Sequence, residues 1–254
     1  MEIKKINIIG FGNVGQNIFN HLDYRVEIVT VYNRSNTQYI KSVLGKRLVN
    51  SLNELSTDVD LNIVSSTDSS IISIIESLPK KVAIVHTSGS ISKDVLNEFD
   101  SFGVFYPLQT FTKGREIQMS EVPFLLEANS SVFLNEITEF TQDNFTNNIH
   151  YFNSQQRSSI HIAAVFINNF TTLMVREAES ILKINKINLS ILEPLLKETV
   201  AKIIETNPKS SQTGPAHRND MNVIYGHINE IGDKSRKEIY KLLTYRIIDL
   251  NSNS

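Results

Sequence analysis

The segment IKKINIIGFGNVG, residues 3–15, joins an apolar run to three glycines, Gly10, Gly12 and Gly15. In such a G-x-G-x-x-G pattern the first glycine makes a tight turn, the second lets the backbone approach a pyrophosphate, and the third lets a helix pack closely on the strand. The free N–H groups at the start of that helix then face the phosphate charge. We therefore predict a strand, a turn and a helix that bind a dinucleotide, rather than a plain tight turn, through Gly10, Phe11, Gly12, Asn13, Val14 and Gly15.

The next predicted strand, residues 26–32, is followed by Asn33, Arg34 and Ser35. NAD-selective sites place a carboxylate at this position to hold the ribose 2′-hydroxyl, and none is present here. Arg34 can pair with a 2′-phosphate, and Asn33 and Ser35 can donate hydrogen bonds to it. We expect NADP rather than NAD, unless Arg34 only solvates the loop.

Short β-branched runs alternate with amphipathic stretches along the first two thirds of the chain, as is typical of a parallel sheet with crossover helices. The predicted strands cover residues 3–9, 26–32, 61–65, 82–86, 103–106 and 123–126. Two pairs, Ser35 with Gln38 and Ser51 with Glu54, have the spacing of capping boxes. From residue 154 a three-four apolar spacing predicts one long helix, followed by helices at residues 189–204, 218–231 and 234–249.

These patterns predict an α/β fold class. A Rossmann-like, doubly wound parallel sheet is expected over residues 1–152 and an all-α domain over residues 153–250.

Composition excludes several classes of function. The 254 residues include 25 Lys+Arg against 27 Asp+Glu, a formal net charge of -2, and no cysteine. The charge balance gives no reason to expect nucleic acid or anionic lipid, and without cysteine there are no disulfides, thiolate nucleophiles or Cys-zinc sites. No metal-binding pattern is present. With no signal-peptide core, and an apolar run at residues 160–167 far shorter than the roughly 20 residues of a span, we expect a cytoplasmic protein that binds no membrane.

Open parallel sheets bind ligands beyond the carboxyl ends of their strands, so the residues that follow each strand are candidates. Ser66 and Thr67 either contact the cofactor ribose or cap the next helix. Thr87 and Ser88 are expected to shape the nicotinamide end of the site. His86 is either a proton donor or a structural group that ends a strand.

The long helix carries a polar stripe. His161 and Asn168 are seven residues apart and so share an α-helical face, with Asn169 adjacent. The stripe is either a line of hydrogen bonds in an interface or the substrate-facing wall of an active cleft. Farther on, Arg218 suits a carboxylate or phosphate, or forms a salt bridge with Asp220. Because a helix that is apolar nearly all round must be covered on every side, we expect a homodimer through the helical domain.

The ordered motifs resemble a bacterial family that pairs a Rossmann-like domain with a helical carboxyl-terminal domain of unknown function. The resemblance covers nearly the whole chain and is carried by residues 10–15, 85–90, 106–111, 161–166, 169–170 and 213–215, with Arg218 and Asp220. More distantly, the layout is similar to the superfamily of 6-phosphogluconate dehydrogenase, ketopantoate reductase and pyrroline-5-carboxylate reductase, in which the helical domain commonly dimerises. The resemblance implies an NADP-linked oxidoreductase.

Two positions depart from the superfamily pattern. Several of those dehydrogenases carry a lysine proton donor on the long helix, four residues before an asparagine, where this chain has Ala164 or Val165. Tyr106, before Pro107, stands where the family and prephenate dehydrogenases usually have histidine.

We therefore expect hydride transfer between the nicotinamide of NADP and a small C=O or C=N substrate in a cleft between the domains. His161 is the first candidate for the proton donor, with His86 and Tyr106 behind it; Asn169 would orient the reacting atom and Arg218 would hold a substrate carboxylate. Two other hypotheses stay open. A non-catalytic NADP sensor is favoured by the missing lysine, and a prephenate-dehydrogenase-like oxidative enzyme rests on the Pro107 loop alone.

Overall fold

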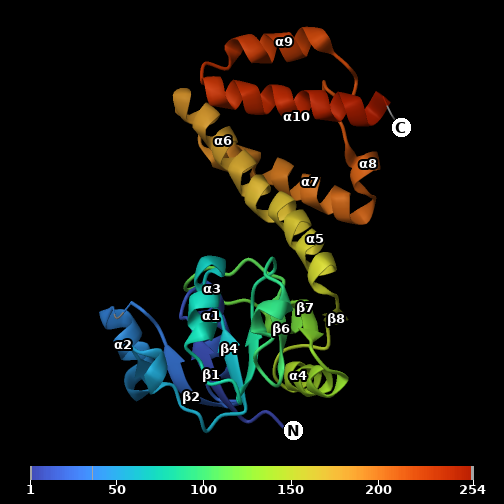
Figure 1. Cartoon of the computed structure of the whole chain (residues 1–254). Helices are drawn as coiled ribbons and strands as arrows, with labels where there is room; N and C mark the ends of the chain where they lie inside the picture. The colour runs from blue at the N-terminus through green and yellow to red at the C-terminus, as the bar shows by residue number, and fades with distance from the viewer. Residues whose placement is uncertain (1, 36, 253–254) are drawn as a thin grey trace. The chain divides into compact units, whose positions relative to one another are not determined.

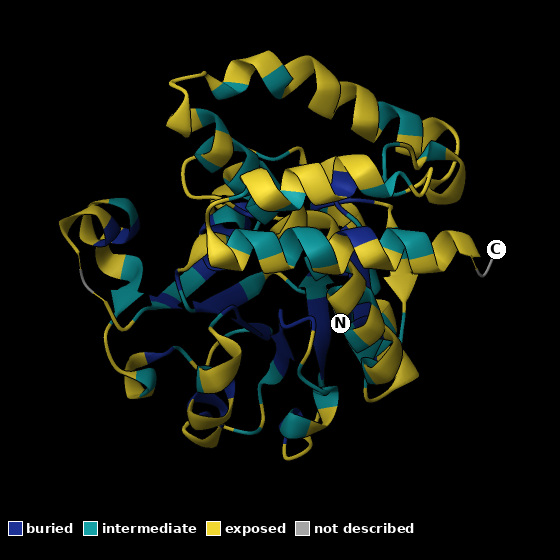
Figure 2. Ribbon diagram, turned by 90° about the horizontal axis from the view of Figure 1, so that it is seen from above, coloured by how far each residue is buried: buried dark blue, intermediate teal, exposed yellow. Residues whose placement is uncertain are grey.

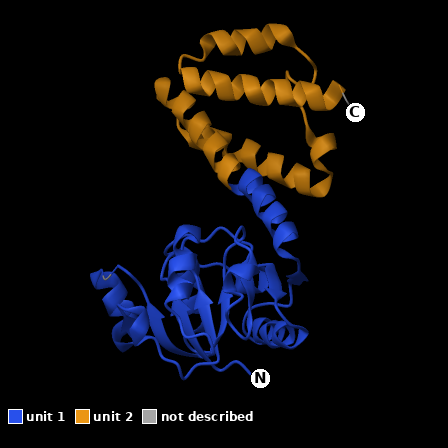
Figure 3. Cartoon of the chain, in the orientation of Figure 1, with its two compact units in different colours: residues 1–168 blue, residues 169–254 orange. Residues whose placement is uncertain are grey.

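The chain divides into two compact units, Met1–Asn168 and Asn169–Ser254 (Figure 3). The computed structural model describes residues 2–35 and 37–252. The boundary between residues 152 and 153 stays a prediction: the last strand ends at Tyr151 and the next helix begins at Ser154, whereas the two units divide later, inside a helical segment. The first turns of that segment therefore belong to the first unit.

The first unit is built on an eight-stranded sheet in the order β3-β2-β1-β4-β5-β6-β7-β8 (Figure 1). The strands are β1 (Lys5–Ile9), β2 (Glu27–Tyr32), β3 (Leu48–Val49), β4 (Leu61–Val64), β5 (Ala83–His86), β6 (Phe102–Pro107), β7 (Phe124–Ala128) and β8 (Ile149–Tyr151). All neighbouring pairs are parallel except β6 and β7. The Rossmann-like doubly wound class is confirmed, but the sheet is not wholly parallel.

Strand β7 reverses direction because its connection from β6 lacks a crossover helix. The connection contains only the 3-10 turn η4 (Met119–Glu121), and a parallel return needs a crossover of a dozen or more residues that is usually helical. The short edge strands β3 and β8 were not predicted, because two or three residues carry too little alternation to be recognised.

Helices bury both faces of the sheet. Helices α1 (Asn13–Leu22), α2 (Gln38–Leu44) and α4 (Ser131–Asn144) contribute to one hydrophobic cluster, and α3 (Asp68–Glu76) with the 3-10 turn η3 (Lys93–Leu96) to another. Successive strand residues alternate between them: Ile8 belongs to the first cluster and Ile9 to the second. Figure 2 shows the central strands largely in dark blue, the colour of buried residues. This double coverage explains the consecutive apolar residues in the strands.

Two of the predicted helix starts differ from the structure. Thr37, not Ser35, caps α2, and its side chain accepts a hydrogen bond from the Ile40 N–H at 3.3 Å. The Ser51–Glu54 capping box is present, although it opens only the 3-10 turn η2 (Leu52–Glu54). A further 3-10 turn, η1 (Gly45–Arg47), follows α2.

The predicted long helix is not α-helical throughout. Helix α5 (Ser154–Val165) passes into a π-helical segment, η5 (Phe166–Phe170), and then into α6 (Thr171–Ile184). A π turn holds more residues than an α turn, so it breaks the periodicity on which the expected common face of His161 and Asn168 rested.

The second unit continues with η6 (Leu189–Leu192), α7 (Glu193–Glu205), α8 (Pro208–Ser211), α9 (Met221–Glu230) and α10 (Lys234–Ser252). The carboxylate of Asp220 caps α9, accepting from the Val223 N–H at 3.3 Å. The all-α prediction for this region is therefore confirmed.

Among the described residues, one helical segment, Ser154–Ile184, is long and apolar enough to cross a membrane by length and composition alone, and none of its apolar window is buried. The apolar run at residues 160–167 is itself short, as expected, but the helix around it carries few charges, so a longer window meets this criterion.

Candidate functional site

The glycine turn between β1 and α1 fits the roles expected for its three glycines. Gly10 has φ +106°, and a Cβ there would lie 2.7 Å from the Ser65 carbonyl oxygen. A Cβ on Gly15 would lie 2.1 Å from the Gly10 carbonyl oxygen. A Cβ on Gly12 would meet nothing within 4 Å. The chain's own packing thus requires Gly10 and Gly15, whereas Gly12 presents bare backbone at an open position where a ligand can approach.

Neighbouring side chains hold this turn in place. The Asn33 side-chain oxygen accepts from the Phe11 N–H at 3.1 Å, and the Ser65 hydroxyl donates to the Gly10 carbonyl at 2.7 Å. Helix α1 has no side-chain cap and no acidic residue in its first turn, so its positive amino-terminal end can face an anion. Arg34 and Ser35, after β2, are exposed.

The residues after β4 and β5 mainly shape their own loops. Thr67 occupies the N-cap position of α3, but its hydroxyl contacts those of Ser69 and Ser70 instead of a helix N–H. The buried Thr87 donates its N–H to the Val64 carbonyl at 3.0 Å. The Ser88 hydroxyl accepts from the Ser90 and Ile91 N–H groups at 3.1 and 3.0 Å. Contacts of Ser66, Thr67, Thr87 and Ser88 with a cofactor stay predictions.

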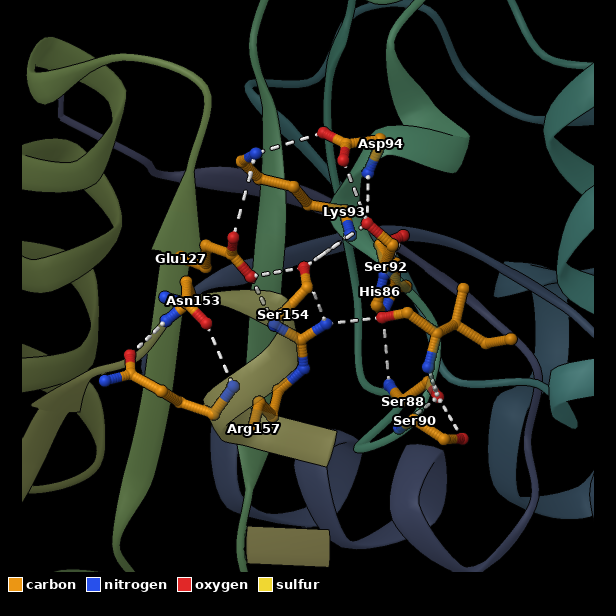
Figure 4. Close-up of polar contacts among 12 residues, drawn as sticks. His86, Ser88, Ser90, Ser92, Lys93, Asp94, Glu127, Asn153, Ser154 and Arg157 are labelled. Atoms are coloured by element: carbon orange, nitrogen blue, oxygen red, sulfur yellow. Dashed lines mark hydrogen bonds and ion pairs between the residues drawn. The ribbon is translucent and has the colours of Figure 1, made fainter. Parts of the chain in front are cut away.

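His86 is fully buried at the end of β5 (Figure 4). Its Nδ1 accepts from the Ser88 N–H at 3.2 Å, so the proton of the neutral ring lies on Nε2, which is 3.4 Å from the Ser92 carbonyl oxygen. Burial, followed by the nearby positive charge of Arg157, lowers the pKa of His86 to about 4. The geometry matches the structural alternative that the sequence left open for this residue.

Tyr106 and His161 form a dyad within the first unit. The Tyr106 Oη lies 3.1 Å from the His161 Nδ1, and the two rings meet edge to face with centroids 6.0 Å apart. Gly89 makes this contact possible, because a Cβ there would lie 2.6 Å from the His161 Nδ1 and 2.9 Å from the Tyr106 Cζ. Sequence reasoning selected both ring residues separately but did not foresee their contact or this role of Gly89.

The surroundings of the dyad favour a protonated tyrosine. Burial raises the pKa of Tyr106, Arg157 opposes that shift, and the carboxylate of Asp68 adds to it. Asp68 accepts a short hydrogen bond from the Ser90 hydroxyl. A phenol that stays protonated can donate to the His161 Nδ1, which leaves the proton of a neutral imidazole on Nε2. Asp68, the first residue of α3, was not among the sequence candidates because an acid there is ordinary for a helix start.

Two other candidates, Asn169 and Arg218, belong to the second unit and are exposed. The dyad forms without either of them. Their expected contacts with a substrate therefore stay predictions.

Comparisons with known proteins agree with this fold. Residues 122–247 match the family model "Domain of unknown function (DUF2520)". The "putative NADP oxidoreductase" of Bacteroides fragilis is 34% identical, with a TM-score of 0.89 over 97% of this chain and 98% of that one. The chain belongs to its family. No curated protein sequence matches the chain.

More distant structures share the fold of this family member. An imine reductase from Myxococcus stipitatus, solved in complex with NADP+, is 14% identical with a TM-score of 0.67 over 98% of this chain and 93% of that one. A 1-pyrroline-5-carboxylate reductase from Streptococcus pyogenes is 17% identical with a TM-score of 0.60, covering 98% of both chains.

We predict that burial of His86 makes the protein less stable in mild acid. Its folded-state pKa of about 4 lies below the ordinary 6.5, so the unfolded chain binds the proton first. The stability contribution is complete above pH 6.5 and is lost as the pH falls to about 4, a change of about 3 kcal/mol. Urea denaturation across this range should show His86→Gln with a flatter pH dependence than the unsubstituted protein. His150→Gln, at an exposed site, is the control, and equal slopes for the unsubstituted protein and His86→Gln would refute the prediction.

We also predict that Gly89→Ala separates the dyad. The added methyl group must displace the His161 or Tyr106 ring, and such overpacking costs about 1–3 kcal/mol. Urea denaturation measures the cost, and a crystal structure of the variant should show a longer Oη–Nδ1 distance. Gly226→Ala is the matched control, because it lies inside α9 with nothing within 4 Å of a new Cβ. An unchanged dyad in Gly89→Ala would contradict this reading of the contact.

Proposed function

We propose that this family member is an NADP-dependent oxidoreductase that transfers hydride between the nicotinamide and a small C=O or C=N substrate. The observation that carries the proposal is the Tyr106–His161 dyad, which lies in the same Rossmann-like unit as the glycine turn. The description of the Bacteroides relative and the NADP+ complex of the Myxococcus enzyme support the choice of cofactor.

Residues of the first unit fit the phosphates of NADP. The open backbone at Gly12 and the N–H groups of the first turn of α1 would hold the pyrophosphate. The exposed Arg34 would pair with the 2′-phosphate at the end of β2, where no carboxylate opposes it. When bound, the cofactor supplies the hydride chemistry.

The dyad supplies the proton that must accompany hydride. Reduction of C=O or C=N adds hydride to carbon and a proton to oxygen or nitrogen. Because Tyr106 donates to Nδ1, His161 can present an N–H at Nε2 to that heteroatom. Asn169 would orient the heteroatom and Arg218 would hold a substrate carboxylate.

Cofactor binding and turnover test the proposal together. Arg34→Ala should raise the Kd for NADPH by about tenfold to hundredfold, the loss of about 1.5–3 kcal/mol from a charged hydrogen bond, and leave the Kd for NADH unchanged. In a panel of imines, keto acids and other carbonyl compounds, His161→Gln and Tyr106→Phe should lower kcat by about 10²–10⁴-fold without changing the Kd for NADPH. Calorimetry and NADPH absorbance measure the two effects.

Arg25→Ala, which removes another exposed arginine of this unit, is the control for Arg34→Ala. If calorimetry detects no binding of NAD+, NADH, NADP+ or NADPH, the proposal is overturned altogether. NADPH binding without turnover of any compound would favour the sensor hypothesis instead. If the enzyme oxidises its substrate with NADP+ faster than it catalyses the reverse reduction, the prephenate-dehydrogenase-like alternative would be favoured.

The helical unit supports a second proposal, a cytoplasmic homodimer. Among its described hydrophobic residues, Ile224 alone is buried, whereas Ile191, Leu195 and Leu242 are more than 60% exposed. An apolar groove of about 270 Å³ runs between α6 and α7, lined mainly by Met174, Val175, Ala178, Leu192, Leu195 and Leu196. An exposed apolar surface of this kind marks an interface, and a two-fold axis lets one surface cover its own copy. Lipid fits less well, because His161, Asn168 and Asn169 lie inside the apolar segment.

We expect a dimer in analytical ultracentrifugation at micromolar concentration. Leu195→Glu should shift it to monomer by placing a charge in the groove, whereas Tyr24→Glu, at an exposed site of the first unit, should not. A monomeric unsubstituted protein, or one that floats with lipid vesicles, would contradict the homodimer.

A further inference from the structure

A buried ion pair lies beside the dyad. Arg157, on α5, is 0% exposed, and its Nη1 pairs with the Glu127 carboxylate of β7 (Figure 4). Its Nη2 donates to the Ile91 carbonyl and, at 3.3 Å, to the Ser154 hydroxyl. Its Nε is buried without a partner among the described residues. One guanidinium thus joins a helix, a strand and the loop after β5.

A buried ion pair of this kind adds little net stability to a fold. Desolvating two charges offsets most of their attraction, and apolar side chains of the same size are often as stable or better. The unpartnered Nε of Arg157 adds the cost of a lost hydrogen bond. Stability alone therefore gives little reason for the pair, whereas its geometry suggests another role.

Arg157 links α5, which carries His161, to the loop after β5 and to β7, the strand beside the one that carries Tyr106. Arg157 lies four residues before His161 on α5, so the two side chains share one face of the helix. The Ile91 carbonyl belongs to the loop that also carries Gly89, across which the two rings meet. The position of α5 against this loop and against β7, the strand paired with β6, therefore determines where His161 lies relative to Tyr106.

Further contacts fix the first turn of α5 against the same loop. The Ser154 hydroxyl donates to the Glu127 carboxylate at 2.8 Å and accepts from the Lys93 N–H at 3.2 Å. The Lys93 ammonium lies 3.7 Å from the other Glu127 oxygen, so this carboxylate faces two cations. The helix start is therefore tied to both β7 and η3.

We propose that Arg157 is a positioning residue, which holds α5 and the Gly89 loop in the one spacing that places His161 Nδ1 against the Tyr106 hydroxyl. The side-chain hydrogen bonds of Arg157 go to Glu127, Ile91 and Ser154 and not to either ring, so Arg157 takes no part in proton transfer itself. This inference rests on the proposed function only for the catalytic role of the dyad that Arg157 positions. The contact itself can be measured without substrate or cofactor.

The test reads the dyad hydrogen bond directly. In the full chain carrying 15N-labelled histidine, Tyr106→Phe removes the hydroxyl and should change the 15N chemical shift of His161 Nδ1. His161→Gln assigns the signal. If Arg157 positions the dyad, this Tyr106→Phe effect should disappear when Arg157 is replaced, because the hydrogen bond is already absent.

Two replacements separate positioning from stability. Arg157→Lys keeps a cation for Glu127 but cannot also reach the Ile91 carbonyl. Arg157→Met combined with Glu127→Leu replaces both charges by apolar groups and should leave the thermal midpoint nearly unchanged. Arg236→Met is the matched control, since it breaks the half-buried pair with Glu177 in the second unit. It should lower stability and keep the Tyr106→Phe effect.

The proposal is supported if Tyr106→Phe no longer changes the His161 Nδ1 chemical shift in the Arg157→Lys background. The same result is expected in the apolar double variant, provided that this variant folds. A full Tyr106→Phe effect in Arg157→Lys would overturn it, whether or not the double variant folds. Absence of the effect in the otherwise unsubstituted protein would also overturn it, because no hydrogen bond would exist to be positioned. None of these outcomes depends on whether the protein reduces any compound, so the proposed function can fail separately.

Discussion

The first unit depends on how closely β1 approaches β4. These neighbouring parallel strands lead to helices on opposite faces of the sheet, and open α/β sheets bind ligands beyond the carboxyl ends of such strands. Gly10 ends β1 with its backbone against Ser65, where a Cβ would lie 2.7 Å from a carbonyl oxygen. Any side chain there would push the two strand ends apart. The turn, the uncapped start of α1 and the beginning of the loop after β4 therefore depend on this contact.

Local patterns predicted the fold where they acted over short distances. The glycine spacing at residues 10–15 and the Ser51–Glu54 capping box depend on neighbours in the chain, and the structure has both features. The reversal of β7 follows a connection that has no crossover helix, and neither this connection nor the π turn at Phe166–Phe170 has a residue pattern that sets it apart. Ser35 failed as a cap because Thr37, two residues later, competes for the same helix start.

The candidate site shows the same limit. Tyr106 and His161 each stood out as titratable residues in recognisable places, but their contact spans 55 residues and passes over a glycine. Gly89 gave no signal because glycine is common in turns, and only the ring atoms around it show why a side chain is excluded. Arg157 gave none either, since an arginine in the first turns of a helix is usually exposed.

The two histidines near the end of β5 show why burial decides their roles. Desolvation keeps His86 uncharged, and both of its ring nitrogens contact the backbone of its own loop, so neither nitrogen is free to contact a ligand. His161 is only partly buried and uses one nitrogen on Tyr106, which leaves the other for chemistry. Tyr106, His161 and Gly89 all belong to the first unit, which ends at Asn168. If the proposed function holds, the proton donor would therefore belong to the same unit as the glycine turn, and Asn169 and Arg218 would be the contribution of the other unit.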